Sequence, residues 1–159
     1  MLIRTGLLPF GELGKIQSAL DVNDVGHFEC RWVNLKVEEN PCVFLEGMGG
    51  EIVNFQVAHR EGKFTAETQV LRRIEDQKLV VFRYCDVMGN PTQEYPQNPN
   101  GSLNAIAGIC DPSGRILGLM PHPERFIRKT QHPNWRRMPD LEPQGLQIFE
   151  KMVKYASQT

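Results

Sequence analysis

The sequence lacks the features that mark several common classes of protein. It has only four cysteines in 159 residues and no Cys-x-x-Cys pair, which excludes a disulfide scaffold and a structural zinc site. No apolar run approaches the length of a membrane span, and the first residues do not form a signal peptide. The net charge of −1 gives no electrostatic basis for binding nucleic acid or an anionic membrane. These absences predict a cytoplasmic chain with reduced thiols, no metal, no nucleic-acid partner and no membrane.

Internal repeats and low-complexity linkers are also absent, so we interpret residues 1–159 as a single domain. The pattern of the first residues indicates that this domain is truncated at its N-terminus. Gly6-Leu7-Leu8-Pro9 has the pattern of a helix end, in which Gly supplies a left-handed cap and Pro follows. Only Met1–Thr5 remain for that helix, which is too short to nucleate by itself. We therefore expect an N-terminally truncated domain that begins inside a helix.

The hydrophobic periodicity predicts a mixture of strands and helices. A strand over 28–38 shows a phase shift near Trp32, and a long Gly-, Asn- and Pro-containing loop covers 86–102. A hairpin is expected around the turn Asp111-Pro112-Ser113-Gly114. The other expected elements are strands at 51–58, 79–84, 105–110 and 115–120 and helices at 65–74 and 142–156.

The most informative segment is Gly118-Leu119-Met120-Pro121-His122-Pro123-Glu124-Arg125, directly after a predicted strand. His and Glu two residues apart suit a pair in which an imidazole takes a proton from a nucleophile while a carboxylate fixes its tautomer. The alternative is a structural loop. The position favours chemistry, because functional groups of α/β folds gather on loops beyond strand ends. The natural third member is a Cys or Ser on a Gly-x-Cys-x-Gly or Gly-x-Ser-x-Gly elbow, and the 159 residues contain no such elbow.

Other candidates have both a functional and a structural interpretation. His59 follows a predicted strand and is either part of a substrate pocket or a loop histidine with satisfied hydrogen bonds. His27 and His132 are expected at the surface. The loop 96–102 is interpreted as a turn, because it lacks the spacing of a phosphate-binding loop. A basic group is expected to form a solvated surface, with contact to a partner or phosphate as the alternative; it comprises Arg125, Arg128, Lys129, Arg136 and Arg137.

A cysteine near His122 could also be a nucleophile, although a free Cys is more often a small core residue. Gly108-Ile109-Cys110-Asp111 superficially copies an elbow, but Pro112 and a hairpin turn follow it where an elbow needs a helix. The other three lack flanking glycines and lie in strand-like or loop contexts; they are Cys30, Cys42 and Cys85.

These motifs together resemble the class I, triad-type glutamine amidotransferases. Within that family the closest pattern is the branch of glutaminase subunits of phosphoribosylformylglycinamidine synthase, an enzyme of purine biosynthesis. The resemblance covers essentially the whole chain in the right order. Its most specific parts are the segment 118–125 and Val57-Ala58-His59-x-Glu61-Gly62, in which Arg60 stands where the family usually has Gly. The remaining matching segments are 6–9, 28–32, 98–102 and 106–109.

The resemblance implies an α/β chain that forms the C-terminal portion of a flavodoxin-like, three-layer fold, with a mixed sheet, a β-hairpin and a C-terminal helix. His122 and Glu124 match the family's catalytic His and Glu, and the resemblance places Val57, Ala58 and His59 in the pocket for L-glutamine. The family's Cys nucleophile has no counterpart and belongs to an elbow shortly before the position of Met1. The implied partner is a large synthetase subunit, which would hold ATP and Mg, whereas this chain would hold no cofactor.

Three functions follow from these observations. The first is the glutaminase component of phosphoribosylformylglycinamidine synthase, inactive alone unless a missing N-terminal segment supplies the nucleophile. The second is a non-catalytic scaffold or regulatory module that keeps the family's partner-binding surface. The third is a self-contained thiol hydrolase that uses Cys85 or Cys110 with His122.

Overall fold

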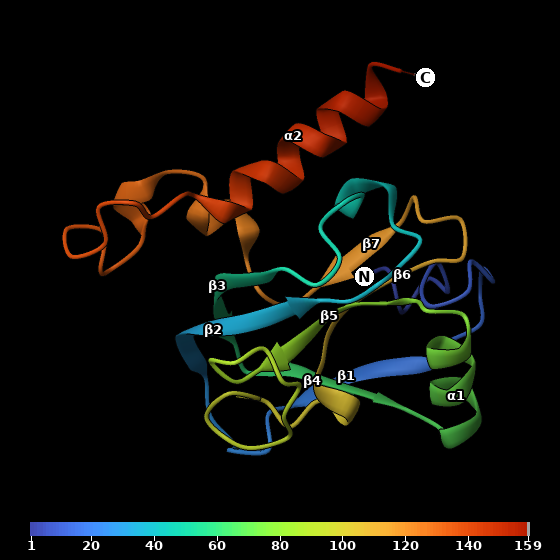
Figure 1. Cartoon of the computed structure of the whole chain (residues 1–159). Coiled ribbons are helices and arrows are strands. Elements are labelled where there is room, and N and C mark those ends of the chain that lie inside the picture. Colours follow the sequence, from blue (N-terminus) through green and yellow to red (C-terminus); the bar gives the residue numbers. More distant parts are fainter. Residues whose placement is uncertain (159) are drawn as a thin grey trace.

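The computed structural model describes residues 1–158 and shows a mixed α/β fold with two α-helices (Figure 1). Thr159, the last residue of the expected single domain, lies outside the described residues. Across residues 1–158, no helix combines the length and the apolar character that crossing a bilayer requires. The regular elements in chain order are β1 (Ser18–Val22), β2 (Glu29–Val37), β3 (Ile52–His59), β4 (Glu61–Ala66), α1 (Thr68–Asp76), β5 (Val80–Cys85), β6 (Ile106–Cys110), β7 (Leu117–Leu119) and α2 (Gln144–Ala156).

The strands form two sheets, which include a curled half-barrel. Five strands lie in the order β3-β2-β5-β6-β7, and β1 pairs with β4 in a separate two-stranded sheet. The expected mixed sheet is wrong for this part of the chain, because every strand pairing described within residues 1–158 is antiparallel. Parallel neighbours need a crossover connection, commonly a helix. Here α1 instead connects β4 of the small sheet to β5 of the large one.

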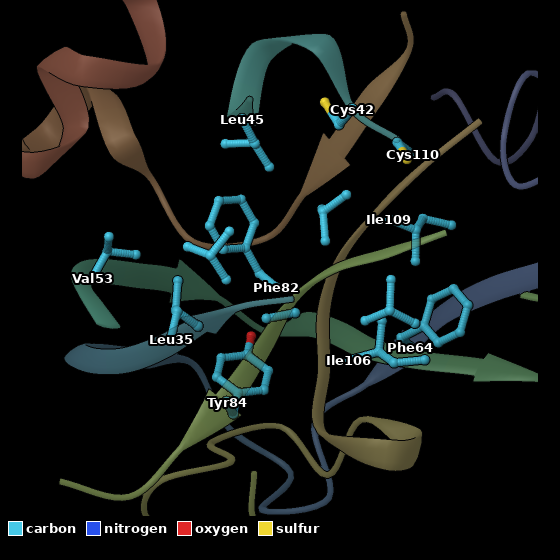
Figure 2. Close-up of a cluster of buried hydrophobic side chains, with 14 of the residues drawn as sticks. Leu35, Cys42, Leu45, Val53, Phe64, Phe82, Tyr84, Ile106, Ile109 and Cys110 are labelled. Carbon is cyan, nitrogen blue, oxygen red and sulfur yellow. The ribbon is translucent and has the colours of Figure 1, made fainter. Parts of the chain in front are cut away.

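The hydrophobic core is built around the strands of the five-stranded sheet (Figure 2). The strand expected at 79–84 is confirmed as β5, whose side chains are buried at five of six positions. Along β2 the phase shift expected near Trp32 is wrong. Glu29, Val33, Leu35 and Val37 are all buried, so alternate residues keep one face from end to end. The apparent shift arose because a carboxylate occupies a core-facing position and the large ring of Phe28 is exposed.

The hairpin and the C-terminal helix are confirmed. The backbone N–H of Asp111 donates to the carbonyl of Ile116 at 3.0 Å, and Gly114 adopts φ +68°, as the tight reversal requires. β6 and β7 pair on either side of this turn. The first helix begins at Thr68, three residues later than expected, because the residues before it pair with β1.

The first residues form turns where the sequence predicts the end of a helix. The N–H of Thr5 donates to the carbonyl of Met1 at 3.2 Å, and Gly6 adopts φ +78°, so the expected left-handed conformation of this glycine is confirmed. β1 and β4 were not predicted. Most of β1 is exposed, and β4 begins two residues after β3 ends, so neither shows an independent apolar run.

Candidate functional site

The site is built around His122 and Glu124, which the structure brings into direct contact. His122 precedes a short 3-10 turn, η3 (Pro123–Phe126), and its Nδ1 lies 2.6 Å from Oε1 of Glu124. A carboxylate only accepts hydrogen bonds, so Nδ1 carries a proton, and in the neutral ring Nε2 presents a lone pair. About a third of the His122 side chain and half of the Glu124 side chain are exposed. The pair therefore has the geometry of an imidazole oriented by a carboxylate, and it is partly open to solvent.

Gln56 of β3 anchors this segment to the sheet. The backbone N–H of His122 donates to the carbonyl of Gln56 at 2.8 Å, and the two residues form an isolated antiparallel bridge. The side chain of Gln56 accepts from Arg125 at 3.2 Å and donates to the sulfur of Cys30 at 3.3 Å. No sequence pattern marks Gln56, because its role depends on pairing between segments 66 residues apart.

A cluster of aromatic rings packs around Phe126, at the end of the same segment. Phe126 is fully buried and packs edge-on against Trp32, with ring centroids 5.4 Å apart. His132 joins them, 4.6 Å from Trp32, so its expected place at the surface is wrong: it is only 7% exposed. Nδ1 of His132 accepts from the backbone N–H of Asn134, and Nε2 lies 3.3 Å from the side-chain oxygen of Asn54. Burial lowers the pKa of His132, which keeps this ring neutral in the cluster.

The other expected site residues lie along β3, beside the strand position that pairs with His122. The side chain of Val57 is fully buried in the core, so only its backbone is available to a ligand. Ala58 is half-buried and points to the face of β3 opposite to that of Val57. Gln56 points to the same face as Ala58, because the two residues are two positions apart in the strand. Arg60 is exposed and has no positive φ, so the backbone at this position does not require the glycine that the resemblance leads us to expect.

His59 is the last residue of β3 and is buried, with 7% of its surface exposed. Burial, together with the charge of nearby His122, lowers its pKa to about 4, and Glu29 acts weakly in the opposite direction. Its Nε2 lies 3.0 Å from Nδ2 of Asn100, a contact between the end of β3 and the 86–102 loop. The loop expected as a simple turn thus contributes a buried residue to the site.

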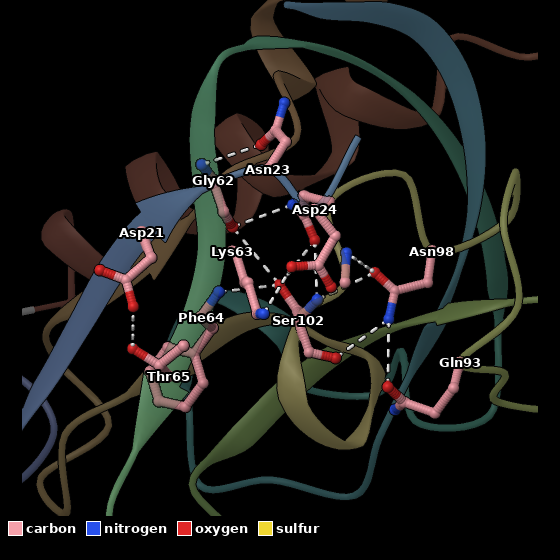
Figure 3. A network of polar contacts seen from close by, with 12 residues as sticks. Asp21, Asn23, Asp24, Gly62, Lys63, Phe64, Thr65, Gln93, Asn98 and Ser102 are labelled. Carbon is pink, nitrogen blue, oxygen red and sulfur yellow. Dashed lines mark hydrogen bonds and ion pairs between the residues drawn. The ribbon is translucent and has the colours of Figure 1, made fainter. Parts of the chain in front are cut away.

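A buried polar network connects that loop with the bend between β3 and β4 (Figure 3). Asn23 donates to the carbonyl of His59 and accepts from the N–H of Gly62. The hydroxyl of Ser102 accepts from the N–H of Phe64 at 2.9 Å. These contacts hold the strand end on which His59 lies, and composition alone could not reveal them.

Glu29 is a buried carboxylate, which sequence reasoning missed. It lies opposite His59 across the β2–β3 pair and is 2% exposed. Its carboxylate accepts from Arg31 at 2.6 Å and from the hydroxyl of Tyr95 at 3.4 Å. His27, whose side chain is 63% exposed as expected, lies 3.1 Å from the same carboxylate.

Cys85 and Cys110, the two cysteines considered as nucleophiles, are poorly suited to that role. Burial raises the pKa of the Cys85 thiol to about 11. A contact with Cys42, together with burial, raises the pKa of Cys110. A nucleophilic cysteine needs the opposite change, since the thiolate is the reactive form. Both residues are also fully buried, and this argues against a self-contained thiol hydrolase.

Exposure and grouping bear on two further candidates. Arg128, Arg136 and Arg137 are exposed, as expected for a solvated basic surface. Lys129 is half-buried and its ammonium donates to the carbonyl of Pro139. Residues 1–158 contain no group of three or more His, Cys, Asp or Glu side chains placed to hold a metal ion.

Comparison with known proteins gives a consistent result. A sequence profile of the CobB/CobQ-like glutamine amidotransferase domain matches residues 1–156. The chain is 41% identical over 160 residues to the phosphoribosylformylglycinamidine synthase subunit PurQ of Methanococcus maripaludis, covering 93% of this chain and 58% of that protein. It is 42% identical to the PurQ subunit of Dehalococcoides mccartyi, covering 99% of this chain and 60% of that protein.

A solved structure extends the comparison to three dimensions. The chain superposes on a chain in the structure of PurLQS from Thermotoga maritima with a TM-score of 0.66 and 30% sequence identity. The match covers 98% of this chain and 57% of the other. The chain thus spans about 60% of the length of the relatives that it matches.

Proposed function

Because the chain belongs to the CobB/CobQ-like glutamine amidotransferase family, we propose that it carries the general base of a glutaminase and the carboxylate that orients it. One observation carries this proposal: Nδ1 of His122 contacts Oε1 of Glu124 at 2.6 Å, leaving Nε2 as the basic nitrogen. In this role a cysteine thiolate attacks the side-chain amide of L-glutamine, and His122 returns a proton to the departing ammonia. Water then releases glutamate from the thioester, with His122 as the base.

The proposed parent enzyme is phosphoribosylformylglycinamidine synthase. The similarity to PurQ subunits supports this assignment, as does the similarity to a chain of the PurLQS structure. In this assignment the partner is the large synthetase subunit, which would receive the ammonia and would hold ATP and Mg. His59, Ala58 and Val57 would line the glutamine pocket, with Val57 contributing its backbone.

The proposed nucleophile is not one of the four cysteines in this sequence. The 159 residues contain no Gly-x-Cys-x-Gly elbow, and the PurQ relatives are longer than this chain. We propose that an elbow segment completes a flavodoxin-like, three-layer fold, of which this chain is the C-terminal portion. An apolar hollow supports this, since it offers such a segment a place to pack; it is lined by Met1, Leu2, Ile3, Leu8, Leu20 and strands β6 and β7.

A chimera tests the proposal. The N-terminal part of a PurQ relative, with its Gly-x-Cys-x-Gly elbow, is fused ahead of Met1, and glutamate and ammonia release are measured with and without the synthetase. We expect no hydrolysis by the 159 residues alone and hydrolysis by the chimera. His122→Gln should reduce kcat by about 10³-fold or more, since triad members act as a unit. Cys30→Ser is the matched control, because this exposed thiol is expected to be dispensable.

Two results would contradict the proposal. Full activity of the His122→Gln chimera would show that this imidazole is not the base. A chimera that folds and binds the synthetase without hydrolysing glutamine would favour the alternative, a non-catalytic scaffold or regulatory module.

A further inference from the structure

Asn100 is completely buried and its side-chain amide has a fixed orientation. The oxygen of the amide accepts from the hydroxyl of Ser102 at 2.7 Å and from the backbone N–H of Ser102 at 3.1 Å. A backbone N–H can only donate, so this end of the amide must be the oxygen. The other end is therefore the NH₂ group, and exchanging the two ends would set donor against donor at Ser102.

That NH₂ group has two hydrogens and lies within hydrogen-bond distance of three groups. It lies 3.0 Å from Nε2 of His59, 2.9 Å from the carbonyl of Gly62 and 3.0 Å from the hydroxyl of Tyr84. An amide nitrogen donates and does not accept, so a proton on Nε2 of His59 would face another donor. The neutral ring therefore carries its proton on Nδ1.

Gly62 holds the ring against this NH₂ group. A Cβ built on Gly62 would lie 2.1 Å from Cδ2 and 2.2 Å from Nε2 of His59, so only glycine leaves room for the ring at this edge. The opposite nitrogen, Nδ1, is buried and has no hydrogen-bond partner among the described residues. A buried donor without a partner costs free energy and calls for an explanation.

We propose that Asn100 is a positioning residue that locks His59 in the neutral Nδ1–H tautomer, so that this N–H serves the ligand of the site as a donor to a carbonyl or carboxylate oxygen. The proposal rests on the proposed function for the identity of that ligand, L-glutamine. It deepens that function by assigning an atom, a protonation state and the residue that sets them. Of the two histidines, only His122 then acts as a base, because the lone pair on Nε2 of His59 faces the NH₂ group of Asn100.

The test is a nitrogen-15 NMR spectrum of the whole 159-residue chain with labelled histidine, recorded across pH 5–8. We expect His59 to show a protonated Nδ1 and an unprotonated Nε2 throughout this range. The variant His59→Gln assigns its signals, and His132 provides an internal reference for an intact fold. A protonated Nε2 on His59 in the unaltered chain would overturn the proposal without any variant.

Asn100→Asp gives the decisive comparison, because it replaces a donor with an acceptor of the same shape. Nε2 of His59 should then become protonated, and the pKa of His59 should rise by about 1 to 3 pH units. Asn100→Ala should give a mixture of tautomers. Asn98→Asp is the matched control: it is a buried asparagine of the same loop whose side chain contacts Gly101 and Ser102 and does not contact His59.

The outcomes separate this inference from the proposed function. An unchanged His59 tautomer and pKa in a folded Asn100→Asp chain would overturn the role of Asn100. In the glutaminase chimera, L-glutamine should shift the Nδ1–H proton of His59, and Asn100→Ala should raise KM more than it lowers kcat. A chimera without glutaminase activity whose His59 still shows the locked tautomer would count against the proposed function alone.

Discussion

Replacing Gly62 by alanine is the sharpest test of the packing around His59. Gly62 lies in β4 with an ordinary backbone conformation, so the new methyl group acts only through its volume. That methyl would lie 2.1 Å from Cδ2 of His59, where a normal carbon contact needs about 3.5 Å or more. The imidazole is a rigid ring on a strand, so either the ring or the strand must move by more than about 1 Å.

Movement of the ring breaks a specific hydrogen bond. Nε2 of His59 would leave Nδ2 of Asn100, and both groups are buried, so the lost contact costs about 1 to 3 kcal/mol. Overpacking of the surrounding side chains adds about 1 to 3 kcal/mol. We therefore expect Gly62→Ala to lower the free energy of unfolding by about 2 to 5 kcal/mol, a large part of a typical domain's stability.

Urea unfolding followed by circular dichroism measures this change, with Gly49→Ala as the control. The three atoms nearest to a Cβ on Gly49 all belong to the carboxylate end of Glu39, the closest at 2.3 Å, and that flexible side chain can turn away. The control should therefore stay within about 1 kcal/mol of the unaltered chain. Equal unfolding midpoints for the two variants would refute the argument that the His59 ring is pressed against the β4 backbone.

Three further results are expected. Phe126→Ala should destabilise the chain by about 3 to 5 kcal/mol in urea unfolding, because the ring is fully buried against Trp32, whereas Leu13→Ala, at a side chain 73% exposed, should be nearly neutral. Asp111→Ala should cost about 2 kcal/mol, since its carboxylate accepts from three backbone N–H groups and a hydroxyl of the hairpin turn; an unchanged melting temperature would contradict this. The pKa of His59 is about 4 in the folded chain against an unperturbed value of 6.5, so the unfolded chain takes up the proton at a higher pH than the folded chain does. The free energy of unfolding should therefore be unaffected by this residue above pH 6.5 and should fall by about 3 kcal/mol as the pH falls to 4. A His59→Gln chain should lose most of that slope, and equal slopes for the two chains would show that another group causes it.

Sequence reasoning succeeded where the signal is local. The hairpin follows from the residues of its turn, and the β5 strand follows from an apolar run, because a central strand buries both of its faces. The proximity of His122 and Glu124 follows from their spacing, with a Pro before each. In each of these cases the determining interactions lie within a few residues.

Sequence reasoning failed where a polar group takes a buried position. Glu29 faces the core because Arg31 and Tyr95 satisfy its carboxylate, and this made the alternation along β2 look broken. His132 is buried because its two nitrogens find partners in Asn134 and Asn54. In both cases a long-range or irregular contact determines the burial, and hydrophobic periodicity carries no record of it.

The strand β3 explains why the site and the fold depend on the same residues. At Gln56 it binds the backbone of His122, and three residues later it ends at His59, which the loop residue Asn100 holds in place. A strand holds functional groups more precisely than a loop can, because the ladder to β2 fixes its register along eight residue pairs. A slip of one residue would turn His59 outward and remove the bridge to His122. Variants that loosen β3 should therefore disturb both histidines before they unfold the chain, whereas variants confined to α2 should affect stability without changing the tautomer of His59.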